Sequence, residues 1–370
     1  MIRQMAMDFA KEEVLPIAAK IDHEHSYPKD LIRKMGDLGF MGALASAKHE
    51  GSEMTATAYA LSIEEIASAC ASTAIIMSVN NSLFIDPLNK FANKEQQDKY
   101  IKDVSQAKKL GCFALSEPGT GSDAAALTCK VKLEGDKYVI NGSKNWITNA
   151  PVADYCILFA MQDSMKGNKG ITAFVHSLKL PGIEIGKKED KLGICGSPTA
   201  SISYKDVELS KENLLGKEYE GFKIAMSTLN GGRIGVAAQA VGIAKAALRD
   251  AMNYAKERKT FGKLIYKHQT LQNYFADMIT KLTAARYLTI AAARSKDNNK
   301  DYVMQSAMAK LFASEVAMDL ASKGIQIHGG YGYVKEYPAE RHFRDAKITE
   351  IYEGTSEIQR LVIASELFKS

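Results

Sequence analysis

The sequence predicts an α+β protein in which a helical part, a sheet and a second helical part follow one another. Apolar residues make up 46% and charged residues 25% of the 370 residues, a balance that excludes a disordered chain. There are only 8 Pro but 15 Met, which favours much helix. Strand-like alternation is confined to the middle of the chain, so helices and strands are segregated rather than alternating.

Residues 1–110 are expected to form an N-terminal helical domain. Apolar residues such as Phe9 and Val14 recur at helical spacing among charges. The Ala- and Ile-rich stretch 61–77 predicts a helix buried on several sides, and 94–102 carries the charges of a surface helix.

Residues 111–213 are expected to form a middle β domain. An apolar run ends at a Ser-Glu-Pro-Gly breaker cluster, and Gly135-Asp136 separates two alternating segments in the manner of a hairpin. The expected strands span 111–115, 128–133, 137–141, 155–161, 171–176 and 200–204.

Residues 214–370 are expected to form a C-terminal bundle of long helices joined by short, Gly-marked connections. The expected helices span 234–258, 271–294, 302–327 and 357–368.

Charge and cysteine content exclude several functional classes. The 48 Lys and Arg against 43 Asp and Glu give a net charge of +5, too weak for a nucleic-acid partner. No two of the five cysteines stand at C-x-x-C spacing, which argues against a disulfide framework or a zinc site and fits a reducing compartment. His23 and His25 have no third ligand nearby, so no metal site is expected.

Membrane and targeting signals are also not expected. No segment approaches the roughly 18 uninterrupted apolar residues of a membrane span. The first five residues lack the apolar core of a secretory signal, so no targeting segment is visible.

The first motif with chemical content is Ala-Leu-Ser-Glu-Pro-Gly-Thr-Gly-Ser-Asp at 114–123. It contains G-x-G-x-x-A at Gly119, Gly121 and Ala124, but a dinucleotide site needs a helix directly after the glycines. Only 124–127 is available before the next strand pattern. We therefore expect a tight loop that presents N–H groups and hydroxyls to a ligand.

Three further motifs each allow two interpretations. Trp146, the only Trp, is either a core residue or a flat wall beside a flat cofactor, with Thr148 as a hydrogen-bonding neighbour. The glycines of 326–333 either allow close approach of a ligand or simply end a helix. Glu353, before a turn at which Thr355 or Ser356 caps the last helix, is either a poised base or a capping acid.

Together and in this order, the four motifs resemble the acyl-CoA dehydrogenase family, and most closely its short-chain (butyryl-CoA) branch. The resemblance covers nearly the whole chain and includes 76–83, 187–193, 232–235, 258–262 and 337–341. It implies an N-terminal helical domain, a middle β domain and a C-terminal four-helix bundle. It also implies FAD between the domains and a homotetramer built as a dimer of dimers.

The resemblance implies oxidation of a short-chain acyl-CoA to the trans-2-enoyl-CoA, in fatty acid β-oxidation or related metabolism. A medium or branched acyl-CoA is the alternative substrate. Glu353 would be the base, its own N–H and a ribityl hydroxyl would hold the enolate oxygen, and the hydride would pass to flavin N5. Electrons would leave through an electron-transfer flavoprotein. The location would be the mitochondrial matrix in a eukaryote and the cytoplasm in a bacterium.

Site residues are carried over position by position. Those expected to contact FAD are Phe113, Ala114, Leu115, Ser116, Gly121, Ser122, Trp146, Ile147, Thr148, Arg258, Phe261, Gln269, Gln326, Ile327, His328, Gly329, Gly330, Thr355, Ser356 and Glu357. Those expected to contact substrate are Ser122, Asn230, Gly231, Gly232, Arg233 and Gly354. Arg258, Gln269 and the 326–330 loop would reach the FAD of the neighbouring subunit.

The sequence departs from the family pattern at three places. The loop 46–51 lacks the usual Pro-Glu-x-x-Gly-Gly form, Asn230 stands where the branch usually has Asp, and His328 replaces an apolar residue. Three rival functions stay open: a nicotinamide oxidoreductase that uses Gly119 and Gly121, a non-catalytic acyl-CoA protein, and an acyl-CoA oxidase, whose usual extra C-terminal domain is not expected here.

Overall fold

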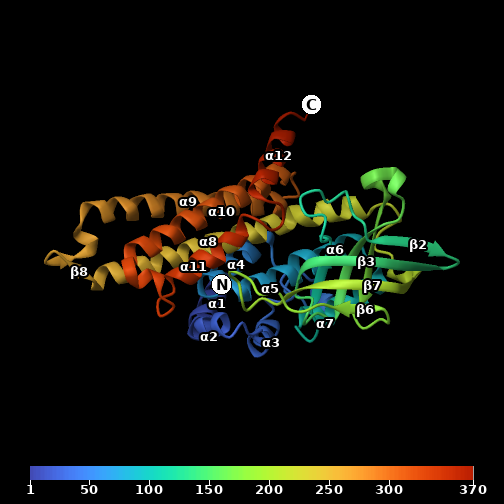
Figure 1. The fold of residues 1–370 in the computed structure, drawn as a ribbon, viewed down its shortest axis with the longest axis horizontal. Coiled ribbons are helices and arrows are strands. Elements are labelled where there is room, and N and C mark those ends of the chain that lie inside the picture. Colours follow the sequence, from blue (N-terminus) through green and yellow to red (C-terminus); the bar gives the residue numbers. More distant parts are fainter. Residues whose placement is uncertain (370) are drawn as a thin grey trace.

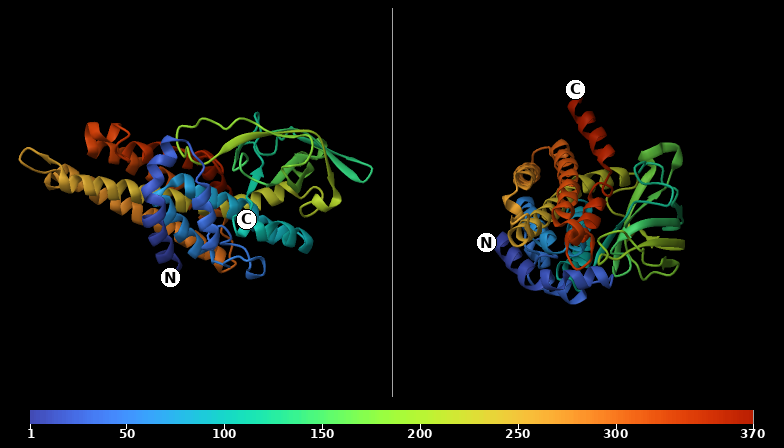
Figure 2. Two further views of the ribbon diagram at one scale, coloured as in Figure 1. Left: turned by 90° about the horizontal axis from the view of Figure 1, so that it is seen from below. Right: turned by 60° about the vertical axis from the view of Figure 1, so that its left-hand side comes forward.

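The computed structural model describes residues 1–369 and confirms the order helices, sheet, helices. In Figure 1 the long C-terminal helices lie lengthwise, the sheet occupies one end of the molecule, and the first helices lie along one side. Figure 2 shows the same separation of sheet and helices from two further directions. We propose domain boundaries at 110 and 213, which fall in the connections before the first strand and before the longest helix.

The N-terminal part consists of short helices. They are α1 Ile2–Phe9, α2 Ala18–His23, α3 Lys29–Asp37, α4 Ala56–Ala69, α5 Ala71–Ser78, α6 Asp86–Phe91 and α7 Lys94–Ser105. The predicted continuous helix over 61–77 is wrong, because Cys70 adopts an extended conformation (φ −154°, ψ 110°) between α4 and α5. Both helices are nevertheless buried on several sides, as predicted, and every residue of α5 is buried.

The middle part contains one sheet of seven strands. They are β1 Gly111–Ala114, β2 Lys130–Glu134, β3 Lys137–Thr148, β4 Tyr155–Met161, β5 Ile171–Ser177, β6 Ile183–Ile185 and β7 Thr199–Ser210. The strand order is β1-β4-β2-β3-β7-β6, with β5 also paired to β4. Only β1 and β2 run parallel to β4; the β2–β3 hairpin predicted around Gly135 is confirmed. β6 was not predicted, since three residues are too short for a period-2 pattern.

The sheet is buried on both faces at β1, β4 and β5, whereas buried and exposed residues alternate along much of β3 and β7. Along β4, Ile157 and Phe159 belong to the core that the sheet shares with the helices, whereas Cys156 and Leu158 belong to a core on the other face. The residues after Gly121 form turns and then β2, with no helix at 124–127. This arrangement lacks the helix that a dinucleotide fingerprint requires.

The C-terminal part consists of α8 Gly221–Glu257, α9 Gln269–Asp297, α10 Val303–His328, α11 Ala339–Thr349 and α12 Ser356–Leu367. α10 packs against the other four helices. α8 begins at Gly221, well before the predicted 234, because Gly231 and Gly232 remain helical. A Cβ on Gly235 would lie 2.6 Å from the Ser78 Oγ, so close packing of α8 on the N-terminal helices explains that glycine. The hairpin β8 Lys259–Thr260 and β9 Lys263–Leu264 projects at the end remote from the sheet (Figure 1).

Within residues 1–369, no helix is long and apolar enough to cross a membrane. The same residues contain no cluster of His, Cys, Asp and Glu that would hold a metal ion. All five cysteines are buried free thiols.

Candidate active site

Glu353 lies in the turn between α11 and α12, in a left-handed conformation with φ of 52°. Gly354 follows with φ of 89°, a value that favours glycine, and Thr355 caps α12 by accepting a hydrogen bond from the Ile358 N–H. The Glu353 Oε2 atom is shielded from solvent and has no hydrogen-bond partner among the described residues. Glu353 is half-buried as a residue, and its shielded Oε2 is free to accept a proton.

α8 supplies the surface against which this carboxylate lies. A Cβ built on Gly232 would lie 2.0 Å from the Glu353 Oε2, so only glycine leaves room for the carboxylate there. The next residue, Arg233, is buried, and its Nη1 donates a hydrogen bond to the Asn230 Oδ1 at 2.8 Å. An Asp at 230 would form an ion pair with Arg233, whereas Asn230 contributes a hydrogen bond and no negative charge.

Burial raises the pKa of Glu353 to about 7, against the opposing effect of two cations, Lys310 and Arg233. Burial also lowers the pKa of Arg233, and Glu353 partly compensates. A carboxylate with a pKa near neutrality is matched to the task of accepting a proton from carbon.

The loop after β1 is held by an ion pair inside the sheet. Lys144 of β3 and Glu117 are both fully shielded from solvent, and the Lys144 Nζ lies 2.7 Å from the Glu117 Oε1. The Glu117 carboxylate also accepts hydrogen bonds from the N–H groups of Thr128 and Cys129. Cβ atoms on Gly119 and Gly121 would meet nothing within 4 Å, so the loop faces open space.

Trp146 stands beside this loop at a bulge in β3. The pairing of β3 with β7 shifts between Lys144 and Ile147, and Trp146 adopts φ of 61°. The extra residue turns the indole outward, so that Trp146 is 61% exposed while Ile147 is buried. The interpretation of Trp146 as a core residue is wrong, and an indole available to a ligand remains.

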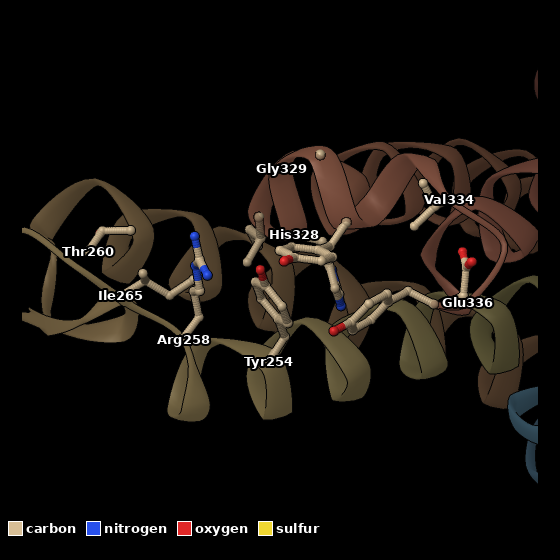
Figure 3. A pocket seen from close by; sticks show the side chains of 12 residues that line it. Tyr254, Arg258, Thr260, Ile265, His328, Gly329, Val334 and Glu336 are labelled. Carbon is tan, nitrogen blue, oxygen red and sulfur yellow. The ribbon is translucent and has the colours of Figure 1, made fainter.

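A separate cavity of about 700 Å³ lies between the β8–β9 hairpin and the end of α10 (Figure 3). Its lining residues are Tyr254, Arg258, Thr260, Ile265, Ile327, His328, Gly329, Gly330, Tyr331, Val334, Glu336 and Tyr337. The Arg258 guanidinium lies 5.7 Å from the centre of the Tyr331 ring. His328 is buried and stacks on Tyr254 with ring centres 4.4 Å apart. The cavity thus presents one cation among aromatic rings.

Comparison with known proteins shows which family has the three domains that carry these features. Family models for acyl-CoA dehydrogenase match the chain with their N-terminal domain at residues 1–108, their middle domain at 112–207 and their C-terminal domain at 219–368. The short-chain specific acyl-CoA dehydrogenase, mitochondrial, of Homo sapiens is 51% identical over 370 residues, covering 100% of this chain and 90% of that protein. The chain belongs to the acyl-CoA dehydrogenase family.

Two solved structures are similar to this chain over its whole length. Butyryl-CoA dehydrogenase from Megasphaera elsdenii superposes with a TM-score of 0.97 at 44% identity, covering 100% of this chain and 97% of that one. A chain from work on the electron transferring flavoprotein of Acidaminococcus fermentans superposes with a TM-score of 0.98 at 47% identity, with the same coverage.

Homologues in the acyl-CoA dehydrogenase family carry FAD, and the residues present fit that group. The outward indole of Trp146 offers a flat surface for a flat ring system. Thr120 has a buried Oγ1 with no hydrogen-bond partner among the described residues, beside the open space at Gly119 and Gly121. Arg258 offers a cation suited to a diphosphate.

The predicted site residues fall into three groups in one chain. Glu353 lies against Gly232 in the 230–233 turn of α8, and Gly354, Thr355, Ser356 and Glu357 follow it in the chain. A second group comprises Phe113, Ala114, Leu115, Ser116, Gly121 and Ser122 with Trp146, Ile147 and Thr148. Arg258, Ile327, His328, Gly329 and Gly330 line the remote cavity; Phe261, Gln269 and Gln326 are exposed near it and do not line it. This remote group lies at the end of the bundle away from the sheet (Figure 1).

The sequence interpretation missed Lys310 and the pair Glu117–Lys144. Lys310 is a lone charge in an Ala- and Met-rich segment, and such a charge at a buried helical position is the signal that could have identified it. Glu117 was taken only as part of a turn. Tyr254, Tyr331 and Tyr337 were missed because no local pattern distinguishes them from ordinary packing residues.

Proposed function

We propose that this protein oxidises a short-chain acyl-CoA to the trans-2-enoyl-CoA and that Glu353 removes the α-proton. The observation that carries the proposal is the shielded, unpartnered Oε2 of the Glu353 carboxylate, which lies against Gly232. Full-length identity of about one half to short-chain specific relatives supports the acyl-CoA substrate class.

The environment of Glu353 suits a base for a weakly acidic proton. Its Oε2 has no competing hydrogen bond, and burial raises its pKa to about 7, so near pH 7 both protonation states are populated. The Glu353 N–H also makes no hydrogen bond within residues 1–369. That N–H is available to hold the thioester oxygen as negative charge develops on it.

When bound, FAD accepts the hydride that leaves the β-carbon. The chain would hold it in two places. In one subunit we assign Phe113, Ala114, Leu115, Ser116, Gly121, Ser122, Trp146, Ile147, Thr148, Thr355, Ser356 and Glu357. From the neighbouring subunit we assign Arg258, Phe261, Gln269, Gln326, Ile327, His328, Gly329 and Gly330.

For the substrate we assign Ser122, Asn230, Gly231, Gly232, Arg233 and Gly354. The support is their position: 230–233 forms the turn of α8 under Glu353, and Arg233 supplies a buried cation close to the base. Gly232 leaves the space that the Glu353 carboxylate occupies.

We further propose a homotetramer and an electron-transfer flavoprotein as electron acceptor. The solved chain from work on the electron transferring flavoprotein of Acidaminococcus fermentans supports the acceptor. The location proposed is the mitochondrial matrix in a eukaryote, as the name of the human relative suggests, and the cytoplasm in a bacterium.

The test is anaerobic single-turnover reduction of the bound flavin by acyl-CoA thioesters of increasing length. We expect butyryl-CoA to react faster than octanoyl- or palmitoyl-CoA. A maximum at eight carbons or longer, or with a branched acyl chain, would assign the alternative substrate.

Glu353→Gln is nearly isosteric and should retain FAD and bind acyl-CoA. Loss of a general base typically slows a reaction ~100- to 10,000-fold. Glu315→Gln, at an exposed pair with Arg360, is the matched control and should react as wild type does. If Glu353→Gln reduces flavin within tenfold of the wild-type rate, Glu353 is not the base.

A further inference from the structure

Lys310 is a buried cation next to the proposed base. It lies on α10 and is completely shielded from solvent, among the apolar residues of that helix. Its Nζ donates a hydrogen bond to the Gly354 carbonyl oxygen at 2.8 Å. Burying an ammonium group costs free energy of folding, which suggests that Lys310 is retained for a function.

The carbonyl that Lys310 holds belongs to the turn that aims Glu353. Glu353 and Gly354 both have positive φ, at 52° and 89°, so the turn needs outside contacts to keep its shape. The Gly354 carbonyl also accepts a hydrogen bond from the Gln359 Nε2 at 2.8 Å, and the Glu353 carbonyl accepts one from the same atom at 3.2 Å. One charged and one neutral donor therefore fix the turn.

The charges around Glu353 come from several elements. Lys310 of α10 and Arg233 of α8 are the two cations that act on the Glu353 carboxylate. Glu350, after α11, and Glu357, at the start of α12, act on Lys310 in addition to Glu353.

Two tyrosines also lie near Glu353, and the ion pair of Asp86 with Lys296 lies at the neighbouring Gly231 of α8. Tyr59 of α4 and Tyr352 both lie close enough to be affected by Glu353, and burial raises the pKa of each, so both stay neutral in the working range. Lys310 and Arg233 are thus the groups that favour an ionised Glu353.

We propose that Lys310 is a positioning residue for the base: it fixes the Glu353–Gly354 turn through the Gly354 carbonyl, and its positive charge stabilises the ionised carboxylate. This inference rests on the proposed role of Glu353. Lys310 touches the turn and not the reacting atoms, so it acts through Glu353.

The directions in which the pKa values of Glu353 and Lys310 are shifted agree with this role. Burial raises the pKa of Glu353, and Lys310 opposes that effect more than Arg233 does. Burial lowers the pKa of Lys310 to about 8, and Glu353 opposes that effect. Near pH 7 Lys310 therefore keeps its proton, and removing its charge would make Glu353 harder to ionise.

The test compares three variants in holoenzyme by single-turnover flavin reduction with butyryl-CoA from pH 6 to 10. Lys310→Met removes the donor and the charge but fills similar space. Lys310→Arg keeps the charge. Gln359→Leu removes the neutral donor to the same carbonyl and changes no charge, so it separates the hydrogen bond from the charge.

We expect Lys310→Met to raise the pH midpoint of the reaction by about one unit, the smaller end of the effect of an adjacent opposite charge. A one-unit rise makes the rate about fivefold lower at pH 7 and comparable with the wild-type rate at pH 10. Lys310→Arg should restore the midpoint, and Gln359→Leu should leave it unchanged. Infrared titration of the protonated Glu353 carboxyl, identified by its loss in Glu353→Gln, should show the same shift without turnover.

A purely structural Lys310 would lower the rate by the same factor at every pH and leave the infrared midpoint where it is, and that result overturns the inference. Failure of the proposed function looks different, because wild-type flavin would then not be reduced by any acyl-CoA. A Gln359→Leu midpoint shift equal to that of Lys310→Met would also overturn the charge effect, since the hydrogen bond alone would explain both.

Discussion

At the scale of the residue, Glu353 occupies a position where ionisation opposes folding. Its pKa is about 7 in the folded protein against 4.5 for an ordinary Glu, so the folded state binds a proton that the unfolded state releases between these values. The stability linked to this group is therefore fully present below pH 4.5 and is lost as pH rises through 7.

We predict that Glu353→Gln, which has no charge to bury, raises the melting temperature of the protein at pH 8. A shift from 4.5 to about 7 corresponds to at most about 3.5 kcal/mol, because each pKa unit is worth about 1.4 kcal/mol. The gain should shrink as pH falls from 7 toward 4.5. Calorimetry at pH 5 and pH 8 measures the gain in melting temperature at each pH. Equal gains at the two pH values would contradict a raised pKa of Glu353.

At the scale of the element, the loop after β1 depends on the fully shielded pair Glu117–Lys144. Burial raises the pKa of Glu117, but Lys144 and Thr128 lower it by more, so the carboxyl is held in its ionised form. The Lys144 Nζ also donates a hydrogen bond to the Leu115 carbonyl oxygen at 3.1 Å. The pair thus fixes the backbone on both sides of the loop assigned to FAD.

We predict that Lys144→Met lowers both the melting temperature and the affinity for FAD. The variant leaves Glu117 buried without its cation, and breaking a buried pair in this way costs about 3–5 kcal/mol. Lys137 lies on the same strand as Lys144 and forms an exposed ion pair with Glu208 of β7. Lys137→Met is therefore the control and should change little. Adding Glu117→Gln to Lys144→Met should recover part of the loss; a double variant no better than the single one would mean that the charge is not the cause.

Secondary structure with a regular period could be predicted from the sequence, whereas its interruptions could not. The hairpin around Gly135 and the three longest helices follow from alternation and from 3.6-residue periodicity. The break at Cys70 and the bulge at Trp146 have no local signal, because packing against other elements sets them. The glycines of α8 suggest a later helix start. They lie within the helix, and they are glycine because a Cβ would collide with Glu353 at Gly232 and with Ser78 at Gly235.

Part of the candidate site could be predicted for a different reason. Glu353, Arg258 and the 113–122 loop were found by similarity to a family, whose motifs are continuous in sequence. Lys310 contacts Gly354, 44 positions away, and Lys144 contacts Glu117 and Leu115, 27 and 29 positions away. Long-range contacts leave no pattern in one sequence. The lone charge of Lys310 among Ala and Met residues signals an unusual position, but only the structure shows which groups the two lysines contact.

At the scale of the whole molecule, α11 joins the three parts of the chain. Arg344 of α11 forms an ion pair with Asp22 of α2 at 2.6 Å, and the neighbouring Asp345 accepts a hydrogen bond from the Ile194 N–H between β6 and β7. Because α11 leads directly into the Glu353 turn, the base is positioned against the N-terminal helices and the sheet together.

The same whole-molecule view separates the two candidate halves of the FAD site. Trp146 belongs to β3 of the sheet, while the hairpin that begins at β8, next to the cavity lined by Arg258 and the 329–330 glycines, lies at the opposite end of the molecule (Figure 1). Phe261, at the tip of the hairpin there, is 96% exposed, an unusual position for a large apolar side chain in an isolated chain. We therefore expect a second subunit to cover the hairpin and to bring its own sheet to this cavity.

We predict that Arg258→Ala weakens FAD binding about 10- to 100-fold, the usual range for one charge-assisted hydrogen bond. Lys256→Ala, two residues earlier and exposed, removes the same charge without lining the cavity and should bind FAD as wild type does. At saturating FAD, Arg258→Ala should still reduce its flavin with butyryl-CoA at nearly the wild-type rate, because Arg258 is remote from Glu353. Fluorescence titration of the apoprotein measures the affinity, and sedimentation measures the assembly. Unchanged affinity, or a holoenzyme that sediments as a monomer, would show that FAD is held within one chain.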